Sequence, residues 1–361
     1  MRASCLLMRA MPSPLRPLVR LPVALAVALA LLASGLHVQA APPGKPIVAK
    51  LADILSPEHP HTRTWQFFAA KVKEKTGGRV EIQVAHSAQL GQTKELYQSV
   101  QMGSIQMAKI PTAFASEWIP EVKVFDLPYL FADRAELWRV LNSPVGDRFR
   151  GDIYGRQGMV GLMWVDDGCR SVYARQPVRR PQDLAGQKIR VQPSEIQIEA
   201  LQAMGGIPTP MAFGEVYLAL QQKVLDGAEN SPVLFWTSKH WEVSKVYSLT
   251  EQFWSVSTLV VNKGWWNKLP EDVRGQIRAA ATEAEGYFQE TYTADEAKAL
   301  DQLKGKGVEI VTDVDRAAFL ARVQPVYEKF VRKNGSELLE QVKAAKGTAA
   351  KPPTPAVAPA K

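Results

Sequence analysis

The hydrophobic period of this chain changes repeatedly over its first third, and this change constrains the fold more than any other feature. Residues 46–52 and 79–85 have the pattern of strands, and between them apolar residues recur at helical spacing. A helical pattern over 93–102 and a strand pattern over 105–110 follow. This β-α-β-α-β order favours a mostly parallel sheet covered by helices, so we expect the α/β fold class. The prolines in residues 56–60 predict a loop there.

The remainder of the chain indicates a second domain and a connection to it. Gly168 interrupts an extended run that begins at residue 159, which predicts a crossing from one domain to the next. Residues 205–210 contain two glycines and two prolines and are expected to form a link. An apolar stripe from Pro270 to Leu303 is longer than most globular helices. We therefore expect a helix that is kinked or that spans both domains.

The first 40 residues have the composition of a secretory signal peptide. They contain four arginines and no acidic residue, then the apolar run 21–32, and Val38-Gln39-Ala40 has the small-residue pattern of a cleavage site. The apolar run is too short to span a bilayer. Cys5 lies upstream of this run, so no cysteine stands at the cut to carry a lipid anchor. We expect a periplasmic protein, cleaved near Ala40, with a disordered tail over 347–361 because Pro, Ala, Thr and Lys dominate there.

Charge and cysteine content exclude several classes of protein. Without the leader, 40 basic residues face 36 acidic ones, so the formal charge falls from +8 to +4. The remaining lysines alternate with acidic residues along helices, as over 71–75, which is typical of a solvated face and gives no support to nucleic-acid binding. Only Cys169 remains after cleavage, so no intrachain disulfide can form. The mature chain is long enough for two domains, each held by its own core.

Arg190 is the first candidate for a binding residue. It stands in the short strand 188–191, between a turn over 183–186 and Pro193, so it lies at a strand end next to a loop. Open α/β sheets bind ligands at such positions. A guanidinium can offer a carboxylate two parallel hydrogen bonds in one plane, which an ammonium cannot. We interpret Arg190 as an anion anchor, and the alternative is an arginine on an edge strand that faces water.

Several motifs together resemble the periplasmic solute-binding proteins of TRAP (tripartite ATP-independent periplasmic) transporters, of the dicarboxylate-binding (DctP) type. The motifs are the run 208–221, the segment 226–230 (Asp-Gly-Ala-Glu-Asn), Arg170 twenty positions before Arg190, and Asn262 followed by Leu269-Pro270. The resemblance covers residues 45–345. It implies a two-lobed periplasmic-binding-protein-like fold with hinge strands and a long helix that spans both lobes. Lobe I would comprise 41–167 with 256–295, and lobe II 168–255 with 296–346.

The resemblance also implies where the ligand binds. Arg190 matches the arginine that binds the carboxylate in this family, and Arg170 a second arginine near the ligand. The family commonly has Asn-Gly-Phe before that second arginine, whereas this chain has Asp167-Gly168-Cys169, so we expect that Asp167 could pair with Arg170 instead. Trp254 either lines a pocket or only packs, and Glu229, in the segment 226–230, is a further candidate for ligand binding. The full set of expected ligand-binding residues is Arg190, Arg170, Asn230, Phe213, Gln92, Glu229 and Trp254.

We therefore expect a binding protein without catalytic residues, cofactor or metal. It would capture an organic acid and deliver it to the membrane permease subunits of a TRAP transporter. We favour a small dicarboxylate, because two arginines could pair two anionic groups, while sugar acids, keto acids and aromatic acids stay open. We expect a monomer. The rival classes are an exported hydrolase that uses the same cleft and a scaffold protein. Cys169 has no Cys/His/Asn constellation beside it, and His59 and His61 have no cluster of further metal ligands in the sequence.

Overall fold

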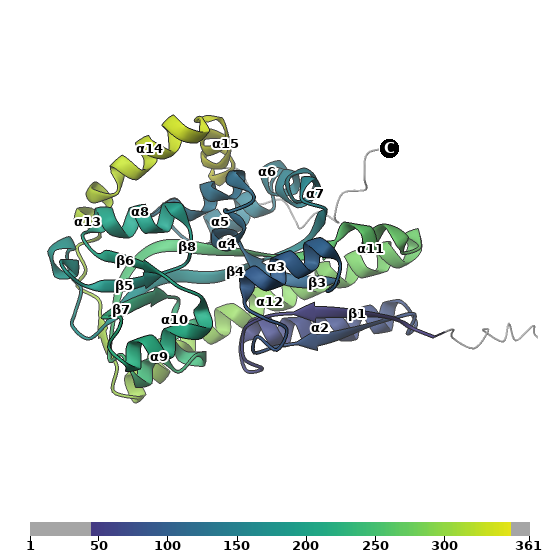
Figure 1. The fold of residues 1–361 in the computed structure, drawn as a ribbon, viewed down its shortest axis with the longest axis horizontal. Coiled ribbons are helices and arrows are strands. Elements are labelled where there is room, and N and C mark those ends of the chain that lie inside the picture. Colours follow the sequence, from purple (N-terminus) through teal and green to yellow (C-terminus); the bar gives the residue numbers. More distant parts are fainter. Residues whose placement is uncertain (1–44, 348–361) are drawn as a thin grey trace, which may run out of the picture. The chain divides into compact units, whose positions relative to one another are not determined.

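The computed structural model describes residues 45–347, which lie in one compact unit, Gly44–Lys361. The predicted signal peptide and the tail from residue 348 onward lie outside the described residues. The described chain is a mixed α/β structure in which helices cover a central sheet (Figure 1). The strands are β1 (Ile47–Ala52), β2 (Val80–Ala85), β3 (Met107–Pro111), β4 (Met159–Ala174), β5 (Lys188–Val191), β6 (Ile207–Pro210), β7 (Gly227–Asn230), β8 (Val246–Asn262) and β9 (Glu309–Val311).

The strands of residues 45–347 form one sheet in the order β2-β1-β3-β8-β4-β7-β5-β6, and β9 pairs with β8. Pairs β3–β8, β4–β8 and β4–β7 are antiparallel, and the other pairs are parallel. The expectation of a mostly parallel sheet therefore holds at the two ends of the sheet and fails at its centre. There, β4 and β8 run side by side over 16 and 17 residues (Figure 1).

Two sequence expectations about strands were wrong. Gly168 does not separate two segments, because β4 continues through it with a register shift against β8 between Asp166 and Gly168. Gly168 has φ +81°, so it accommodates the extra residue of a bulge rather than ending the strand. Residues 207–210 are not a link but strand β6, which pairs with β5 in parallel. β6 lies at the end of the sheet, where the missing N–H groups of its prolines are tolerated.

Helix ends follow the local sequence. Helix α2 begins at Pro60, inside the stretch expected to be a loop, because proline at the first helical position lacks only an N–H that would be unpaired anyway. His59 caps this helix by accepting a hydrogen bond from the backbone N–H of His61.

The helices are α2 (Pro60–Lys75), α3 (Thr93–Met102), α4 (Thr112–Ala115), α5 (Arg134–Leu141), α6 (Pro144–Arg148), α7 (Tyr154–Arg156), α8 (Glu195–Met204), α9 (Val216–Gln221), α10 (Pro232–Thr237), α11 (Lys263–Lys268), α12 (Glu271–Gly305), α13 (Arg316–Arg322), α14 (Gln324–Asn334) and α15 (Glu337–Lys346). Short helical turns are η1 (Pro120–Asp126), η2 (Phe149–Ile153), η3 (Pro181–Leu184), η4 (Phe213–Glu215) and η5 (His240–Glu242).

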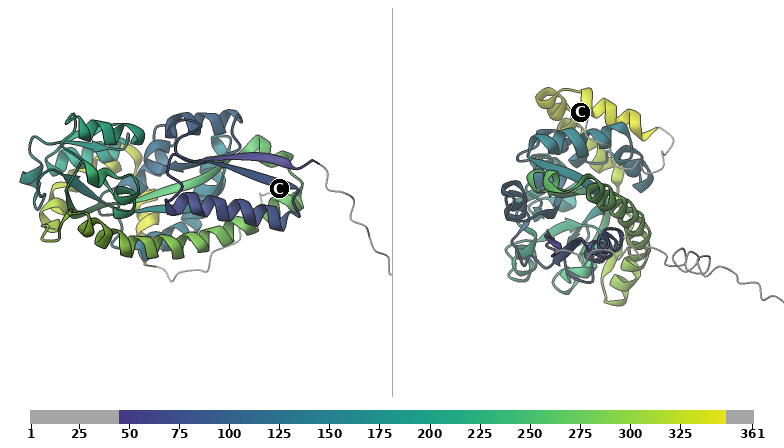
Figure 2. Two further views of the ribbon diagram at one scale, coloured as in Figure 1. Left: turned by 90° about the horizontal axis from the view of Figure 1, so that it is seen from below. Right: turned by 90° about the vertical axis from the view of Figure 1, so that its right-hand side faces the viewer.

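The long apolar stripe forms the single helix α12, which has 35 residues. It lies along α2, the purple helix of Figure 2, and it also packs against β4 and α10. Its buried face carries Val273, Ile277, Phe288 and Tyr292, as the helical spacing predicts. Helix α2 belongs to the predicted lobe I and α10 to the predicted lobe II, so α12 contacts a helix of each predicted lobe. The lobe boundaries themselves remain a prediction.

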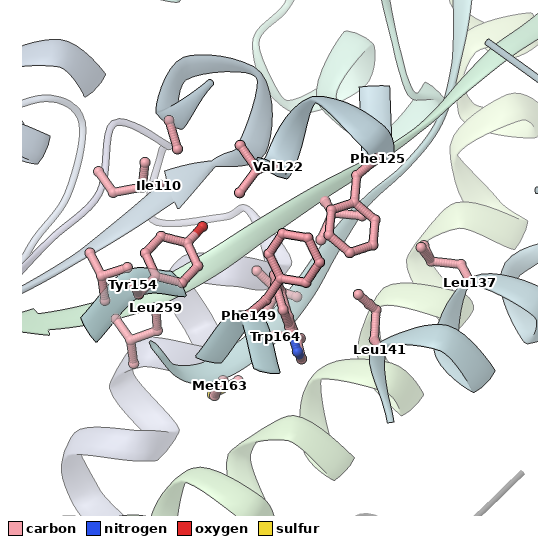
Figure 3. Close-up of a cluster of buried hydrophobic side chains, with 14 of the residues drawn as sticks. Ile110, Val122, Phe125, Leu137, Leu141, Phe149, Tyr154, Met163, Trp164 and Leu259 are labelled. Carbon is pink, nitrogen blue, oxygen red and sulfur yellow. The ribbon is translucent and has the colours of Figure 1, made fainter. Parts of the chain in front are cut away.

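The core beside β3, β4 and β8 is aromatic. Phe125, Phe149, Tyr154 and Trp164 pack with ring centroids 4.8–6.5 Å apart, in tilted and edge-on arrangements that suit aromatic quadrupoles (Figure 3). Phe125 lies in the segment 124–131, which the sequence places in the core. Within residues 45–347, no helix combines the length and the apolar character that a membrane crossing requires.

Candidate ligand-binding site

Arg190 is a buried residue in an interior strand. β5 pairs with β6 on one side and with β7 on the other, and Arg190 lies opposite Thr209 and Ala228. The residue is only 2% exposed. The alternative of an edge arginine that faces water is therefore wrong.

The guanidinium of Arg190 has no counter-charge among residues 45–347. Its Nε and Nη2 donate to the carbonyl oxygen of Met211 at 3.0 and 2.8 Å, which uses two of its five N–H groups. Its Cζ lies 5.9 Å from the ring centroid of Phe213. Burial and the positive charge of Arg170 lower the pKa of Arg190 to about 10. A buried cation with spare donors and no carboxylate partner is suited to bind an anion.

Arg170, in contrast, uses most of its donors on protein groups. Its Nε and Nη2 bind the two carboxylate oxygens of Glu229 at 2.5 and 2.7 Å, and Nη2 also donates to the Glu229 carbonyl oxygen. Its Nη1 donates to Asn230 Oδ1 at 2.7 Å. The expectation that Asp167 could pair with Arg170 was wrong. Asp167 instead accepts hydrogen bonds from Lys109 Nζ and Ser257 Oγ, both at 2.5 Å.

The arginines line a small cavity of about 20 Å³ that adjoins a larger one of about 460 Å³. Both cavities contact Ile54, Leu55, Phe213 and Leu234, so the two spaces are adjacent. Gln92 lines the larger cavity, and its Oε1 is buried with no hydrogen-bond partner in the described residues. The polar residues around the small cavity are Lys109, Asp167, Arg170, Arg190, Gln192 and Asn230. Those around the larger cavity are Ser56, Ser87, Gln92, Tyr217, Thr237, Ser238 and His240.

The charges at the small cavity leave one positive charge uncompensated. Lys109 pairs with Asp167, and Arg170 pairs with Glu229; all four side chains are at most 4% exposed. Arg190 carries the remaining charge. The site therefore has the charge that one anionic group would neutralise.

Two of the residues expected at the site line neither cavity. Glu229 is completely buried and acts as the counter-ion of Arg170. Trp254 lies opposite Cys169 in the β4–β8 pair, whereas Arg170 lies opposite Phe253. Successive strand residues point to opposite faces, so Trp254 points away from the face of Arg170. Its ring lies 5.5 Å from the Cζ of Arg134.

The structure adds residues that the sequence analysis missed. Lys109 lies within the predicted strand 105–110. A lysine inside an otherwise apolar strand indicates a buried, paired charge, and this signal could have identified it. His240, which lines the larger cavity, follows Lys239 in the left-handed region and had no recognisable pattern around it. Among residues 45–347 there is no group of three or more His, Cys, Asp or Glu that could hold a metal ion.

A cavity beside a buried guanidinium that forms no ion pair in the described chain is suited to a protein that binds a small anion. The chain belongs to the DctP family, the bacterial extracellular solute-binding proteins of family 7, whose family model matches residues 51–334. It is thus an extracytoplasmic solute-binding protein of the TRAP type and not an enzyme, as the sequence predicts.

Three relatives illustrate this similarity. The chain is 32% identical over 305 residues to the C4-dicarboxylate-binding periplasmic protein DctP of Rhodobacter capsulatus, which covers 83% of this chain and 91% of the relative. A TRAP periplasmic solute-binding protein of Chromohalobacter salexigens, solved with bound D-glucuronate, has a TM-score of 0.79 and 33% identity, covering 82% of this chain and 99% of the other. The sugar-acid-binding protein DctPAm of Advenella mimigardefordensis, solved with galactonate, has a TM-score of 0.81 and 27% identity over 84% and 98% of the two chains. The predicted fold class is thereby confirmed.

Proposed function

We propose that this protein captures an organic acid whose carboxylate binds to Arg190. The observation that carries the proposal is the buried guanidinium without a counter-charge among the described residues, with donors left over beside a cavity. A carboxylate there would receive charge-assisted hydrogen bonds and restore neutrality in a region from which water is largely excluded. Phe213 would form one wall, and Asn230 and Gln92 would contribute polar contacts.

A single carboxylate fits the charges better than two. The expectation of a small dicarboxylate depended on Arg170 as a second free cation, but Glu229 neutralises Arg170 and occupies most of its donors. A second carboxylate would therefore be buried without a partner of its own, which is costly. We favour a monocarboxylate.

The remainder of the ligand should carry hydroxyl groups. The larger cavity offers Ser56, Ser87, Gln92, Thr237 and Ser238, and a buried polar atom such as Gln92 Oε1 is stabilised by a hydrogen-bond donor. Two relatives were solved with D-glucuronate and with galactonate, both hydroxylated acids. A sugar acid has hydroxyl groups for the polar walls and one carboxylate for the single positive charge.

The path of this acid would be that of a TRAP transporter. We infer export with cleavage near Ala40, closure of two lobes around the acid and its transfer to the membrane permease subunits, because the matched family consists of extracellular solute-binding proteins and the solved relatives include TRAP periplasmic ones. Hydrogen bonds that join the predicted lobes, such as Ser194 Oγ to Asp126 Oδ2 at 2.7 Å, would help to hold the closed state.

A thermal-shift screen over organic acids, neutral sugars and amino acids tests the proposal. A ligand present at ~100 times its dissociation constant adds about 2.7 kcal/mol of stability. Hydroxylated monocarboxylates should raise the melting temperature most, and dicarboxylates less. The proposal fails if neutral sugars or amino acids stabilise the protein and carboxylic acids do not.

A further inference from the structure

His240 occupies a special position in the larger cavity. It opens the turn η5, is only 2% exposed, and its ring lines the cavity. Its ring centroid lies 5.5 Å from that of Phe213, which in turn lies 5.9 Å from the Cζ of Arg190. Phe213 thus lies beside both His240 and the anion anchor.

A hydrogen bond with Tyr173 determines which nitrogen of the His240 ring carries the proton. Tyr173 Oη lies 2.7 Å from His240 Nδ1, and this is the only partner of that hydroxyl in the described chain. Tyr173 is 1% exposed, so its hydrogen would be unpaired in the core unless it donates to Nδ1. Nδ1 is therefore the acceptor, and the proton of the neutral ring sits on Nε2.

The imidazole is neutral and its Nε2 is unused. Burial and the positive charge of Arg190 lower the pKa of His240 to about 3. Within residues 45–347, Nε2 has no hydrogen-bond partner. It is not one of the buried unpaired atoms of the described chain, so it is accessible at the cavity that His240 lines. An N–H donor at the wall of a cavity can bind an acceptor on a ligand in that cavity.

We propose that His240 Nε2–H donates a hydrogen bond to a ligand oxygen remote from the carboxylate, and that it selects acids long enough to pass Phe213. This inference rests on the proposed function, because it takes the carboxylate to be held at Arg190. Arg190 lines the small cavity and not the larger one, whereas His240 lines the larger one and not the small one, so a ligand oxygen that reaches His240 must lie well away from the carboxylate and a longer acid reaches it more easily than a three-carbon one. His240 is thus a length-selecting contact, and Tyr173 is the positioning residue that keeps its proton on Nε2.

Calorimetry with galactonate and with D-glycerate, a six-carbon and a three-carbon hydroxy acid, tests this inference. The quantity of interest is the ratio of their dissociation constants in the mature parent and in the double variant Tyr173→Phe/His240→Leu. The double change removes both partners of the buried hydrogen bond and so leaves no unpaired group in the core. Loss of one neutral hydrogen bond should weaken galactonate about fivefold while D-glycerate changes less than about twofold.

Two further variants keep the test decisive. Tyr173→Phe alone should lower the preference for galactonate in the same direction, since it removes the group that fixes the tautomer, and it covers the case in which the double variant does not fold. Tyr287→Phe is the matched control for Tyr173→Phe, because Tyr287 lines neither cavity. An unchanged ratio in folded Tyr173→Phe/His240→Leu, or in folded Tyr173→Phe if the double variant does not fold, overturns the inference. A parent that binds neither acid overturns this inference alone, whereas Arg190→Ala that binds both normally overturns the proposed function and this inference with it.

Discussion

Arg170 and Arg190 line the same small cavity, and within residues 45–347 only Arg170 has a carboxylate partner. The two arginines therefore differ in their contacts with the protein. Arg170, bound to Glu229 and Asn230, holds β4 against β7, while its charge adds to the positive potential around Arg190. Arg190 keeps its charge at neutral pH, since even a pKa of about 10 lies far above that pH. The free energy that its burial costs can be recovered when an anion binds.

Replacing Arg190 should abolish tight binding of the acid. Arg190→Ala removes a charge-assisted pair and leaves the ligand anion buried without a counter-charge, at a cost on the order of 3–5 kcal/mol of binding free energy. Arg190→Lys keeps the charge but loses the planar fork, so we expect it to lose much of the affinity too. Calorimetry on both variants and the parent measures this.

The same variants test whether Arg190 has a structural role. The unliganded Arg190→Ala protein should unfold in urea at nearly the parent's midpoint, because the loss of the two hydrogen bonds to Met211 is offset by the removal of a buried charge that has no ion-pair partner. Parent-like affinity in Arg190→Lys would refute the geometric argument. Parent-like affinity in Arg190→Ala would remove Arg190 from the site altogether.

Glu229→Gln should destabilise the protein and change its selectivity. It leaves Arg170 buried without a carboxylate, which costs on the order of 3–5 kcal/mol of unfolding free energy. It also raises the charge of the site by one, so the affinity for a dicarboxylate such as succinate should rise relative to that for galactonate. Urea unfolding and calorimetry measure the two effects.

The double variant Arg170→Met/Glu229→Leu is the control for Glu229→Gln. It replaces the ion pair by apolar groups and should regain most of the lost stability. A cost below about 1 kcal/mol for Glu229→Gln would show that the pair is not a structural ion pair. A dicarboxylate preference that does not change would mean that Arg170 cannot reach the ligand.

Much of the fold was predictable from local patterns. β1, β2, α3 and α12 appear close to the expected positions because each has a clear period and a clear stop, such as Gly103 in the left-handed region after α3. β6 was missed because its prolines argue against a strand, and only its place at the end of the sheet makes them acceptable.

The site was predictable in its types of residue but not in its pairings. Arg170, Arg190, Phe213 and Asn230 line one cavity as the motifs indicated. Which acid neutralises Arg170 was not predictable, because Asp167 is close in sequence while Glu229 is brought near by the β4–β7 pairing. His240 and Lys109 acquire their roles only through contacts with distant strands.

The pH dependence of stability should reveal Asp126. Burial raises its pKa from 3.8 to about 7, against hydrogen bonds from Ser194 and Thr112 that lower it. Between these two values the folded protein binds more protons at this site than the unfolded chain, so its contribution to stability is present at low pH and is lost as the pH rises toward 7. In Asp126→Asn this loss should disappear. The free energy of unfolding of the variant, relative to that of the parent, should therefore rise by about 1 kcal/mol per pH unit over that range.

Urea unfolding of the parent and Asp126→Asn at several pH values measures this difference. Glu285 provides a matched second site, because burial raises its pKa from 4.5 to about 7 as well. Glu285→Gln should therefore have a similar effect, and the two changes should add, since they lie in separate networks. Parallel pH profiles for parent and Asp126→Asn would contradict a protonated Asp126 in the folded state.

Gly168 should not tolerate a side chain, because a Cβ there would clash with neighbouring atoms. Gly186 has a similar backbone conformation without such neighbours, so a comparison of the two positions separates the clash from the backbone strain. Gly168 and Gly186 have φ of +81° and +77°, so alanine at either position is strained by about 1–2 kcal/mol. A Cβ at Gly186 would meet nothing within 4 Å, whereas at Gly168 it would lie 2.8 Å from both Ser231 Cβ and Tyr292 Oη. Tyr292 cannot yield easily, since its hydroxyl lies 2.6 Å from the Asp167 carbonyl oxygen and 3.0 Å from Ser231 Oγ.

Gly168→Ala should therefore cost about 1–3 kcal/mol more unfolding free energy than Gly186→Ala, measured by urea unfolding of the two variants and the parent. It should also weaken ligand binding, because Asp167, the neighbour of Gly168, lines the cavity and holds Lys109 there. Gly186→Ala should bind like the parent, as Gly186 lines neither cavity. Equal stability losses in the two variants would mean that the contacts of α12 and Ser231 with the bulge adjust freely, and a normal affinity in Gly168→Ala would mean that the bulge does not position Asp167.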